Sequence, residues 1–286
     1  MKAVICPNFS KNNAFEVTAK VCSILVNMGF ELFGDEEIID RFPPKSRVIP
    51  ASPKEISGEC DFIIAIGGDG TILEASAYAA LGNKPLLGIN TGRLGFMASM
   101  EQTELYNLSK LMSGDYRTEN RMLLECVHRT ENDSEAHIYT ALNDVVIGCK
   151  YSGLTDFSIT AKDREITSVR ADGLIFSTPT GSTAYALSAG GPIIEPSLEC
   201  IQMTPICPHS LFARTMIFDG GRRLTLSAQV KTKGSLYICI DGQITGGIDP
   251  GDALEIYRSE KTLKLIDIAG DSFYSAVNRK LMNSLK

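Results

Sequence analysis

Several common signatures are missing from this sequence of 286 residues. Its eight cysteines include no Cys-x-x-Cys pair and are spread along the whole chain, which argues against a zinc site and against a disulfide-stapled mini-domain. Basic residues are outnumbered, with 28 Lys and Arg against 34 Asp and Glu and a net charge of -6. A nucleic-acid partner usually requires a basic face. We therefore expect reduced, mostly buried thiols and no nucleic-acid partner.

Long apolar runs are missing as well. The first residues, Met1-Lys-Ala-Val-Ile-Cys-Pro7, contain too short an apolar run for a signal peptide and instead predict a first strand. No later run has the length that a membrane-spanning helix needs. We expect a cytoplasmic protein that does not bind a membrane.

The first part of the chain alternates between strand-like and helix-like segments. With 44% hydrophobic residues, the chain is long enough to bury two cores. The predicted strands cover residues 3–6, 31–33, 61–66 and 85–89, and the predicted helices cover residues 14–28 and 72–80. Such alternation is typical of a parallel sheet with helices on its faces. We predict a Rossmann-like α/β domain over residues 1–120.

The pattern changes near residue 121, where short strand-like runs separated by polar turns begin. These runs are residues 123–127, 138–147, 154–161, 174–177, 224–226, 236–240 and 253–257. Their spacing predicts a β-rich, sandwich-like domain over residues 121–265, interrupted by a helix at residues 182–189. A last helix at residues 272–285 predicts that segment 266–286 returns to pack on the first domain.

A Gly-rich loop, Gly67-Gly-Asp-Gly-Thr71, follows the most apolar predicted strand and precedes a helix. Backbone N–H groups and the positive end of the helix dipole make such a loop suitable for phosphate. Glycines leave no Cβ between the backbone and a phosphate, although an ordinary tight turn also uses them. Asp69 repels a phosphate unless it holds a cation or accepts a proton. We therefore predict Asp69 as the catalytic residue of a phosphoryl transfer, with Gly67, Gly68, Gly70 and Thr71 at the donor phosphates.

This loop differs from the commoner phosphate-binding signatures. The chain contains no Gly-x-x-x-x-Gly-Lys-Ser/Thr motif, no Gly-x-Gly-x-x-Gly fingerprint and no protein-kinase signature. A second distinctive stretch covers residues 172–192 and carries hydroxyls at Thr178, Thr180, Ser182 and Thr183. These exceed what a helix cap requires, so several could bind a sugar or base edge. Tyr185 could stack on an aromatic ring, and a capped surface helix is the alternative.

These motifs together resemble the NAD kinase family of bacterial type. The resemblance is carried by the loop at 67–71, Asn90-Thr-Gly-Arg-Leu-Gly-Phe96, Leu142-Asn-Asp-Val-Val146, the stretch at 172–192 and Pro208-His-Ser-Leu211, in the family's order. It implies a kinase that phosphorylates the 2′-hydroxyl of the adenosine ribose of NAD, with ATP or polyphosphate as donor and Asp69 as proton acceptor. A lipid or sugar kinase sharing only the first loop, or a non-catalytic dinucleotide sensor, is the alternative.

The resemblance also implies a set of residues that bind the dinucleotide. They are Asp69, Gly70, Asn143, Asp144, Arg170, Asp172, Thr183, Ala184, Tyr185, Ala186, Leu187, Ser188 and Gln243. An Asn-Asp hairpin turn and a surface ion pair of Arg170 and Asp172 are the plainer interpretations of two of these pairs. The family further implies a divalent cation, Mg²⁺ or Mn²⁺, with no ligand identifiable, and a homodimer or homotetramer. Glu74 stands where many members carry a basic residue, and Arg93 is a possible substitute.

Overall fold

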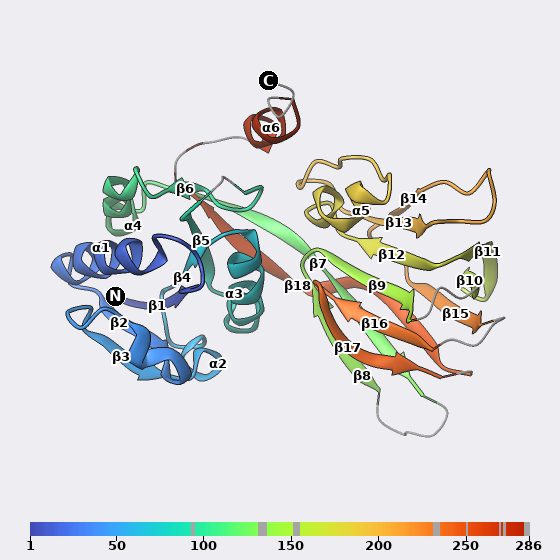
Figure 1. The fold of residues 1–286 in the computed structure, drawn as a ribbon, viewed down its shortest axis with the longest axis horizontal. Coiled ribbons are helices and arrows are strands. Elements are labelled where there is room, and N and C mark those ends of the chain that lie inside the picture. The colour runs from blue at the N-terminus through green and yellow to red at the C-terminus, as the bar shows by residue number, and fades with distance from the viewer. Residues whose placement is uncertain are drawn as a thin grey trace. The chain divides into compact units, whose positions relative to one another are not determined.

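The structure is a computed structural model that describes residues 1–92, 95–130, 136–150, 155–230, 235–249, 251–268, 270 and 273–282. The chain divides into two compact units, Met1–Asn120 with Thr262–Lys286, and Arg121–Lys261 (Figure 1). Strand β18 (Ala253–Asp267) gives its first part to the second unit and its last part to the first. Within the described ranges, no helix is long and apolar enough to cross a membrane.

The first unit is built on a parallel sheet. Its strands are β1 (Lys2–Pro7), β2 (Glu31–Asp35), β3 (Val48–Ala51), β4 (Phe62–Gly67) and β5 (Pro85–Asn90), with the short β6 (Met100–Glu101) beside β5. They lie in the order β5-β4-β1-β2-β3, and the end of β18 adds a parallel pairing to β5. All six residues of β4 are buried, because helices cover both faces of this strand.

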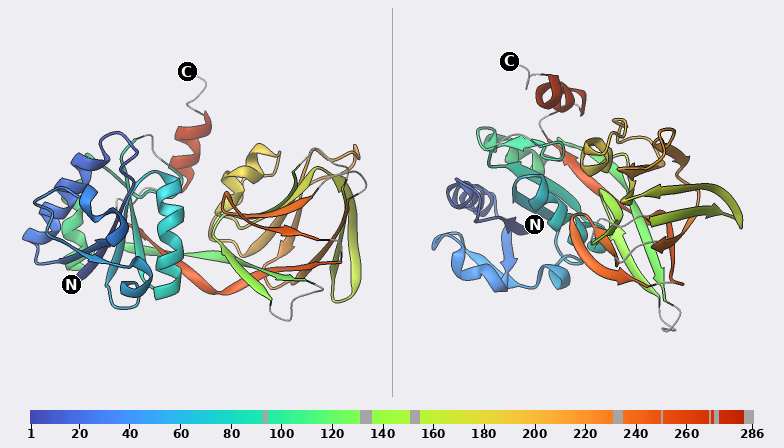
Figure 2. Two further views of the ribbon diagram at one scale, coloured as in Figure 1. Left: turned by 60° about the horizontal axis from the view of Figure 1, so that its bottom comes forward. Right: turned by 45° about the vertical axis from the view of Figure 1, so that its right-hand side comes forward.

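Helices α1 (Ala14–Asn27) and α3 (Asp69–Gly82) cover opposite faces of the parallel sheet (Figure 2). Val17, Val21 and Leu25 recur at helical spacing on α1 and share one core with Ile64 on β4. Shorter helical segments complete the unit: η1 (Glu36–Arg41), α2 (Pro53–Ile56), η2 (Leu105–Ser109), α4 (Lys110–Ser113), α6 (Phe273–Val277) and the π-helical η4 (Asn278–Met282). The predicted α/β architecture of the first part is confirmed.

The strand order of this sheet reverses between β1 and β4. From β1 the chain goes to β2 and β3 on one side, and then to β4 and β5 on the other. In open α/β sheets, ligands bind beyond the carboxyl ends of the strands at such a reversal. The Gly-rich loop leaves the carboxyl end of β4 and so lies at this point.

The second unit contains two sheets around one core. One sheet holds β11 (Arg164–Ala171), β10 (Thr155–Ala161), β15 (Leu224–Val230), β18, β7 (Arg117–Arg129) and β8 (His137–Ala141). The other has the order β14 (Met216–Asp219), β13 (Cys200–Ile206), β12 (Gly173–Ser177), β9 (Asp144–Cys149), β16 (Leu236–Ile240) and β17 (Gln243–Ile248). Phe157 of the first sheet and Phe176 of the second are both fully buried in the shared core. The predicted β-rich second part is confirmed.

Two predicted elements of the second unit are wrong in detail. Residues 138–147 do not form one strand: the chain turns at Leu142 and Asn143, so that β8 and β9 belong to different sheets. The helix predicted at residues 182–189 is interrupted at Ala184, with φ -99° and ψ -124°, into the 3-10 turn η3 (Gly181–Thr183) and the short α5 (Tyr185–Ser188). Both breaks shape the candidate site.

Strands β11 and β13 were missed by the hydrophobic pattern. β13 contains buried polar side chains, and the amide nitrogen of Gln202 donates to the hydroxyl of Thr204 over 2.9 Å inside the sheet. The last predicted helix begins at Phe273 in α6, while Ser272 and residues 283–285 lie outside the described residues. Leu154, the first residue of the strand predicted at residues 154–161, also lies outside them.

All eight cysteines are free thiols. Four are buried, three are half-buried and Cys207 is exposed. Burial raises the pKa of Cys6, Cys22 and Cys126 to about 12, so these thiols stay protonated and unreactive at neutral pH.

Candidate functional site

The Gly-rich loop of the first unit is shorter than its sequence suggests, because α3 already begins at Asp69. Gly68 is the N-cap, and its carbonyl accepts the N–H groups of Thr71 and Ile72 at 2.9 and 3.2 Å. The first N–H groups of a helix have no partner within it, so those of Asp69 and Gly70 point out of the helix end. This end can bind an anion through backbone N–H groups.

The carboxylate of Asp69 receives hydrogen bonds from two distant parts of the first unit. The backbone N–H of Phe96 donates to Oδ2 over 2.9 Å, and that of Met97 donates to Oδ1 over 3.2 Å. Lys280 on η4 places its Nζ 3.4 Å from Oδ2 and 4.1 Å from the centre of the Phe96 ring. These three donors fix both oxygens of the carboxylate in place.

Gly95 allows this arrangement. A Cβ at position 95 would lie 1.6 Å from Oδ1 of Asp69, so no other residue fits beside the carboxylate as it stands. The glycine of the predicted Asn90-to-Phe96 motif therefore has a steric role. Arg93, the possible substitute for a missing basic residue, lies outside the described residues.

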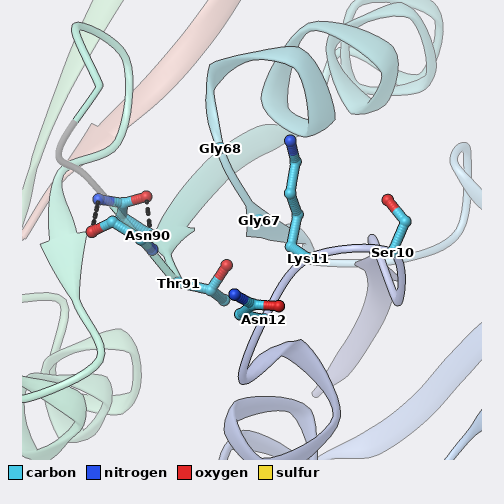
Figure 3. Close-up of a pocket in the computed structure, with 8 residues that line it drawn as sticks. Ser10, Lys11, Asn12, Gly67, Gly68, Asn90 and Thr91 are labelled. Atoms are coloured by element: carbon cyan, nitrogen blue, oxygen red, sulfur yellow. Dashed lines mark hydrogen bonds between the residues drawn. The ribbon is translucent and has the colours of Figure 1, made fainter.

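A cavity of about 390 Å³ lies at the reversal of strand order (Figure 3). Three loops line it, each following the carboxyl end of a parallel strand: Ser10, Lys11 and Asn12 after β1, Gly67 and Gly68 after β4, and Asn90, Thr91 and Gly92 after β5. Asn90 is tied down, since its side chain exchanges two hydrogen bonds with the backbone of Gly92. The ammonium group of Lys11 extends beside Gly68 (Figure 3). It has no hydrogen bond or ion pair among the described residues.

The second unit brings two of the predicted motifs into contact. The hydroxyl of Thr178 donates to the carbonyl of Leu142 over 2.6 Å, and the N–H of Thr178 donates to the carbonyl of Asn143 over 2.9 Å. Gly181 packs so tightly that a Cβ there would lie 2.0 Å from the oxygen of Asn143. The turn at 142–144 and the stretch at 172–192 thus form one structure.

The hydroxyl groups of this stretch have internal hydrogen-bond partners. Thr178 and Ser182 are fully buried, and the hydroxyl of Ser182 donates to the carbonyl of Pro179 over 2.6 Å. Thr183 donates in the same way to Thr180 over 3.2 Å. These hydrogen bonds hold the turn in shape.

Asp144 begins β9 and is only 4% exposed. Burial, and then the negative charge of Asp241, raise the pKa of Asp144 from 3.8 to about 7. The Asp241 carboxylate accepts the backbone N–H groups of Leu142, Asn143 and Asp144 at 2.8, 2.8 and 3.0 Å. An acidic side chain close to its charge transition at neutral pH is typical of a functional site.

The remaining predicted residues lie around the same unit. Arg170 is exposed on β11 and forms a two-pronged ion pair with Asp156, at 2.6 and 3.0 Å, so its ion pair is with Asp156 rather than Asp172. This pairing raises the pKa of Arg170. Asp172 is half-buried between β11 and β12, and Gln243 is exposed at the start of β17. Of the segment from Thr183 to Ser188, Ala186 is buried, while Tyr185 is 47% exposed.

Sequence reasoning missed several residues that touch these sites. Lys11 and its neighbours, the amides of Phe96 and Met97, Lys280 and Asp241 all come from loops or from a distant helix. A loop directly after β1 was a usable signal, because the first strand of a doubly wound sheet ends at the reversal point. Backbone donors and the return of residue 280 to residue 69 leave no pattern in the sequence.

The described residues contain no group of three or more His, Cys, Asp or Glu side chains that could hold a metal ion. Both oxygens of Asp69 already have N–H donors. The described side chains therefore do not fit a metal held by the protein alone. A Mg²⁺ ion that arrives with substrate phosphates needs only one or two protein carboxylates, or none.

A Gly-rich loop at the reversal of a parallel sheet, leading into a helix with an acid in its first turn, is typical of α/β folds that bind nucleotide phosphates. Comparison with protein families makes the assignment specific. Residues 4–116 match the ATP-NAD kinase N-terminal domain, and residues 142–268 match the ATP-NAD kinase C-terminal domain. The chain belongs to the NAD kinase family.

Individual relatives agree with this assignment. An NAD kinase of Caldanaerobacter subterraneus is 36% identical over 282 residues, which is 98% of each chain. An NAD kinase of Moorella thermoacetica is 40% identical over 77% of this chain and 70% of its own. Among solved structures, yeast NADH kinase complexed with NADH has a TM-score of 0.86 at 24% identity, covering 99% of this chain and 87% of its own. An NAD kinase from Archaeoglobus fulgidus in complex with ATP has a TM-score of 0.72 at 24% identity, covering 100% and 98%. The predicted fold class is confirmed.

Proposed function

We propose that this NAD kinase transfers the terminal phosphoryl group of ATP, or of polyphosphate, to the 2′-hydroxyl of the adenosine ribose of NAD, forming NADP. The observation that carries the proposal is the placement of Asp69 in the chain of a family member. It is a carboxylate in the first turn of α3, beside a cavity lined by Gly67 and Gly68. Names of relatives, and the NADH and ATP complexes of two structural neighbours, support the same substrates.

Asp69 accepts the proton in this reaction. As the ribose 2′-oxygen forms its bond to the terminal phosphorus, the hydroxyl proton passes to the Asp69 carboxylate. The bond between that phosphorus and its bridging oxygen breaks, and ADP leaves with the electron pair. Phe96, Met97 and Lys280 hold the carboxylate in one orientation, so it needs no rearrangement before it takes the proton.

The donor phosphates bind in the cavity at the end of the parallel sheet. The N–H groups at the start of α3, including that of Gly70, and the backbone of Gly67 and Gly68 that lines the cavity face the phosphate oxygens. The Thr71 hydroxyl is buried without a hydrogen-bond partner among the described residues and is available to the same loop. Glu74, exposed on α3, stands where many family members carry a basic residue. Lys11, which lines the cavity, supplies a positive charge instead. A divalent cation, Mg²⁺ or Mn²⁺, adds charge neutralisation when it arrives with the donor.

The dinucleotide is bound by residues of the second unit. Asn143 reads the adenine edge through its amide, and Asp144 accepts the ribose hydroxyls. The segment Thr183, Ala184, Tyr185, Ala186, Leu187 and Ser188 lines the dinucleotide. Arg170, Asp172 and Gln243 contact its nicotinamide half, which requires Arg170 to exchange its ion pair with Asp156 for the ligand.

The setting proposed for the enzyme is the cytoplasm, where it acts as a homodimer or homotetramer. Eight free thiols fit a reducing compartment. The proposed oligomer follows from membership of the family, and light scattering of the purified protein measures the number of subunits directly.

The substitution Asp69→Asn tests the assignment. Removing the proton acceptor is expected to lower kcat for ATP-dependent NADP formation by roughly 10²–10⁴-fold. NAD binding should be largely kept because Asn has the shape of the side chain, and the melting temperature should fall modestly because one N–H donor to residue 69 loses its acceptor. Asp61→Asn is the matched control, since Asp61 accepts the N–H of Lys2 at the opposite end of β4 and is exposed.

The outcomes separate the competing functions. Full turnover in Asp69→Asn would remove the proposed mechanism. Tight NADP binding by the wild-type chain without turnover with any donor or metal would indicate a dinucleotide sensor. Turnover of a lipid or sugar in preference to NAD would indicate a different kinase.

Lys11→Met tests the donor site separately. Loss of one cation from the phosphate cavity is expected to raise KM for ATP roughly tenfold, with KM for NAD unchanged. Lys20→Met, on the exposed side of α1, is the control. An unchanged KM for ATP in Lys11→Met would place the donor phosphates elsewhere.

A further inference from the structure

Asp241 and the 142–144 turn are joined by four hydrogen bonds. The Asp241 carboxylate accepts three consecutive backbone N–H groups, from Leu142 and Asn143 at 2.8 Å each and from Asp144 at 3.0 Å. In return, the N–H of Asp241 donates to the carbonyl of Asp144 over 3.0 Å. Asp241 and Gly242 form the two-residue turn between β16 and β17, with positive φ angles of 49° and 85°, as Asp-Gly hairpin turns of this kind require. In this turn the Asp241 carboxylate faces the neighbouring turn at residues 142–144.

The neighbouring Asp144 is the opposite case. It is 4% exposed, and its carboxyl group has no hydrogen-bond partner among the described residues. The titratable groups that face it are Asp241 and the Cys239 thiol of β16, whose pKa is raised by burial and then by Asp144. Its register partner on β12 is the uncharged Ser177. A buried acid without a partner is unfavourable when ionised, so it keeps its proton more tightly than usual.

We propose that Asp241 is a positioning residue of the NAD site: its carboxylate holds the 142–144 turn, and its negative charge controls when Asp144 ionises. The proposal rests on the proposed function, in which Asp144 binds ribose hydroxyls. Two acids this close ionise one after the other. Burial raises the pKa of Asp241, but three N–H groups that stabilise its ionised form lower it again, so Asp241 carries the charge and Asp144, which lacks such donors among the described residues, carries the proton.

Binding of NAD then depends on pH in a stated direction. An ionised carboxylate accepts both ribose hydroxyls, whereas a protonated one has lost part of its accepting capacity. Burial and the charge of Asp241 raise the pKa of Asp144 to about 7, so affinity for NAD rises as the pH passes upward through neutrality. Replacing Asp241 by Asn removes the charge, lowers the pKa of Asp144 and moves the midpoint to lower pH.

Calorimetric titration of the full-length protein with NAD, without donor, tests this between pH 5 and pH 9. The wild-type dissociation constant is expected to fall roughly tenfold between pH 6 and pH 8, following the ionised fraction of a group with pKa about 7. Asp241→Asn should bind NAD more weakly, with its midpoint roughly one pH unit lower or more. Asp219→Asn is the matched control, because the exposed Asp219 also caps a turn by accepting the N–H of Gly221 at 2.9 Å. Its midpoint should equal that of the wild type.

Asp144→Asn separates failure of this inference from failure of the proposed function. If it leaves NAD affinity and its pH dependence unchanged, Asp144 does not bind the ribose and the proposed function is wrong at this residue. If it removes the pH dependence while Asp241→Asn keeps the wild-type midpoint, Asp144 is at the site but Asp241 does not control it. If Asp241 had only a structural role, Asp241→Asn would weaken NAD binding at every pH without moving the midpoint. That result would also overturn the inference.

A measurement on the wild-type protein keeps the test decisive if Asp241→Asn fails to fold. Carboxyl carbon resonances of aspartate are followed by NMR across the same pH range, and the signal lost in Asp144→Asn identifies residue 144. A midpoint near 7 supports the proposal. A midpoint in the ordinary range of an aspartate overturns it.

Discussion

Asp69 in the first unit and Asp144 in the second are both acids at the start of a regular element, yet their surroundings differ. Asp69 receives two backbone N–H groups and the Lys280 ammonium. Asp144 has a buried carboxyl group with no partner among the described residues, next to a second acid. The Asp69 carboxylate thus already has hydrogen-bond donors on both oxygens, whereas the Asp144 carboxyl group has none among the described residues.

This difference matches two kinds of task. A proton acceptor works best when its geometry is fixed before the substrate arrives, because reorganisation adds to the barrier. A residue that recognises hydroxyl groups gains more when those hydroxyls supply the missing hydrogen bonds, since a buried polar group without a partner is costly. The surroundings of the two acids thus support a catalytic role for the first and a binding role for the second.

Gly95→Ala breaks the Asp69 side of the comparison and should have the largest effect. The new methyl group would occupy a position 1.6 Å from Oδ1, so the carboxylate must move. A displacement of about 1 Å is expected to lower kcat roughly a hundredfold, while NAD binding changes little. Steady-state NADP formation and NAD calorimetry measure both. In Gly58→Ala, the added methyl meets nothing within 4 Å, so this control should keep wild-type kcat.

Lys280→Met removes one of the three donors on Asp69 and should have a smaller effect. We expect kcat to fall several-fold to about tenfold, with KM for both substrates nearly unchanged, because the two backbone donors remain. Arg279→Met is a sharp control, since Arg279 lies next to it on η4 but pairs with Glu101, at 4.0 Å, rather than with Asp69. Equal losses of kcat in both variants would mean that η4 affects turnover only through its packing on the first unit, and not through the contact of Lys280 with Asp69.

Asp144→Asn sharpens the second half of the comparison through the stability of the fold rather than through turnover. The pKa of Asp144 is raised from 3.8 to about 7 in the folded chain, so the folded state holds this proton more tightly than the unfolded state. The stability gained by holding it is complete below about pH 4 and is lost as the pH rises through 7. Asn cannot ionise, so the variant should be more stable than wild type at pH 8, by on the order of 2–4 kcal/mol before solvent relaxation.

Urea unfolding at pH 5 and pH 8 measures this difference. The advantage of the variant should shrink at pH 5, where residue 144 is uncharged in both folded chains. If Asp144→Asn were less stable than wild type by the same amount at pH 5 and pH 8, the stability would not depend on the ionisation of Asp144. Asp219→Asn should show no dependence of this kind, because Asp219 is exposed.

Much of this fold could be predicted from the sequence, because its signals are local. The apolar run that forms β4, the glycines after it and the helix that follows are typical of a phosphate-binding βα unit, and the structure has all three. The contrast between the two halves of the chain also follows from local patterns. Strand β13 could not be predicted from the hydrophobic pattern because its buried side chains include polar ones, and nothing local in the sequence marks the break of the helix at Ala184.

The candidate sites show the same division. The sequence by itself determined which side chains have the chemistry: Asp69 at a helix start, Asn143 and Asp144 in a polar turn, and a stretch rich in hydroxyls. Only the tertiary structure decided what each group contacts, because hydrogen bonds from residues 96, 97 and 280 to Asp69, and from residues 142–144 to Asp241, join segments far apart in the chain. Spacing along the chain carries no record of such distances. The fold therefore turned one acid into a fixed acceptor and left the other without a partner.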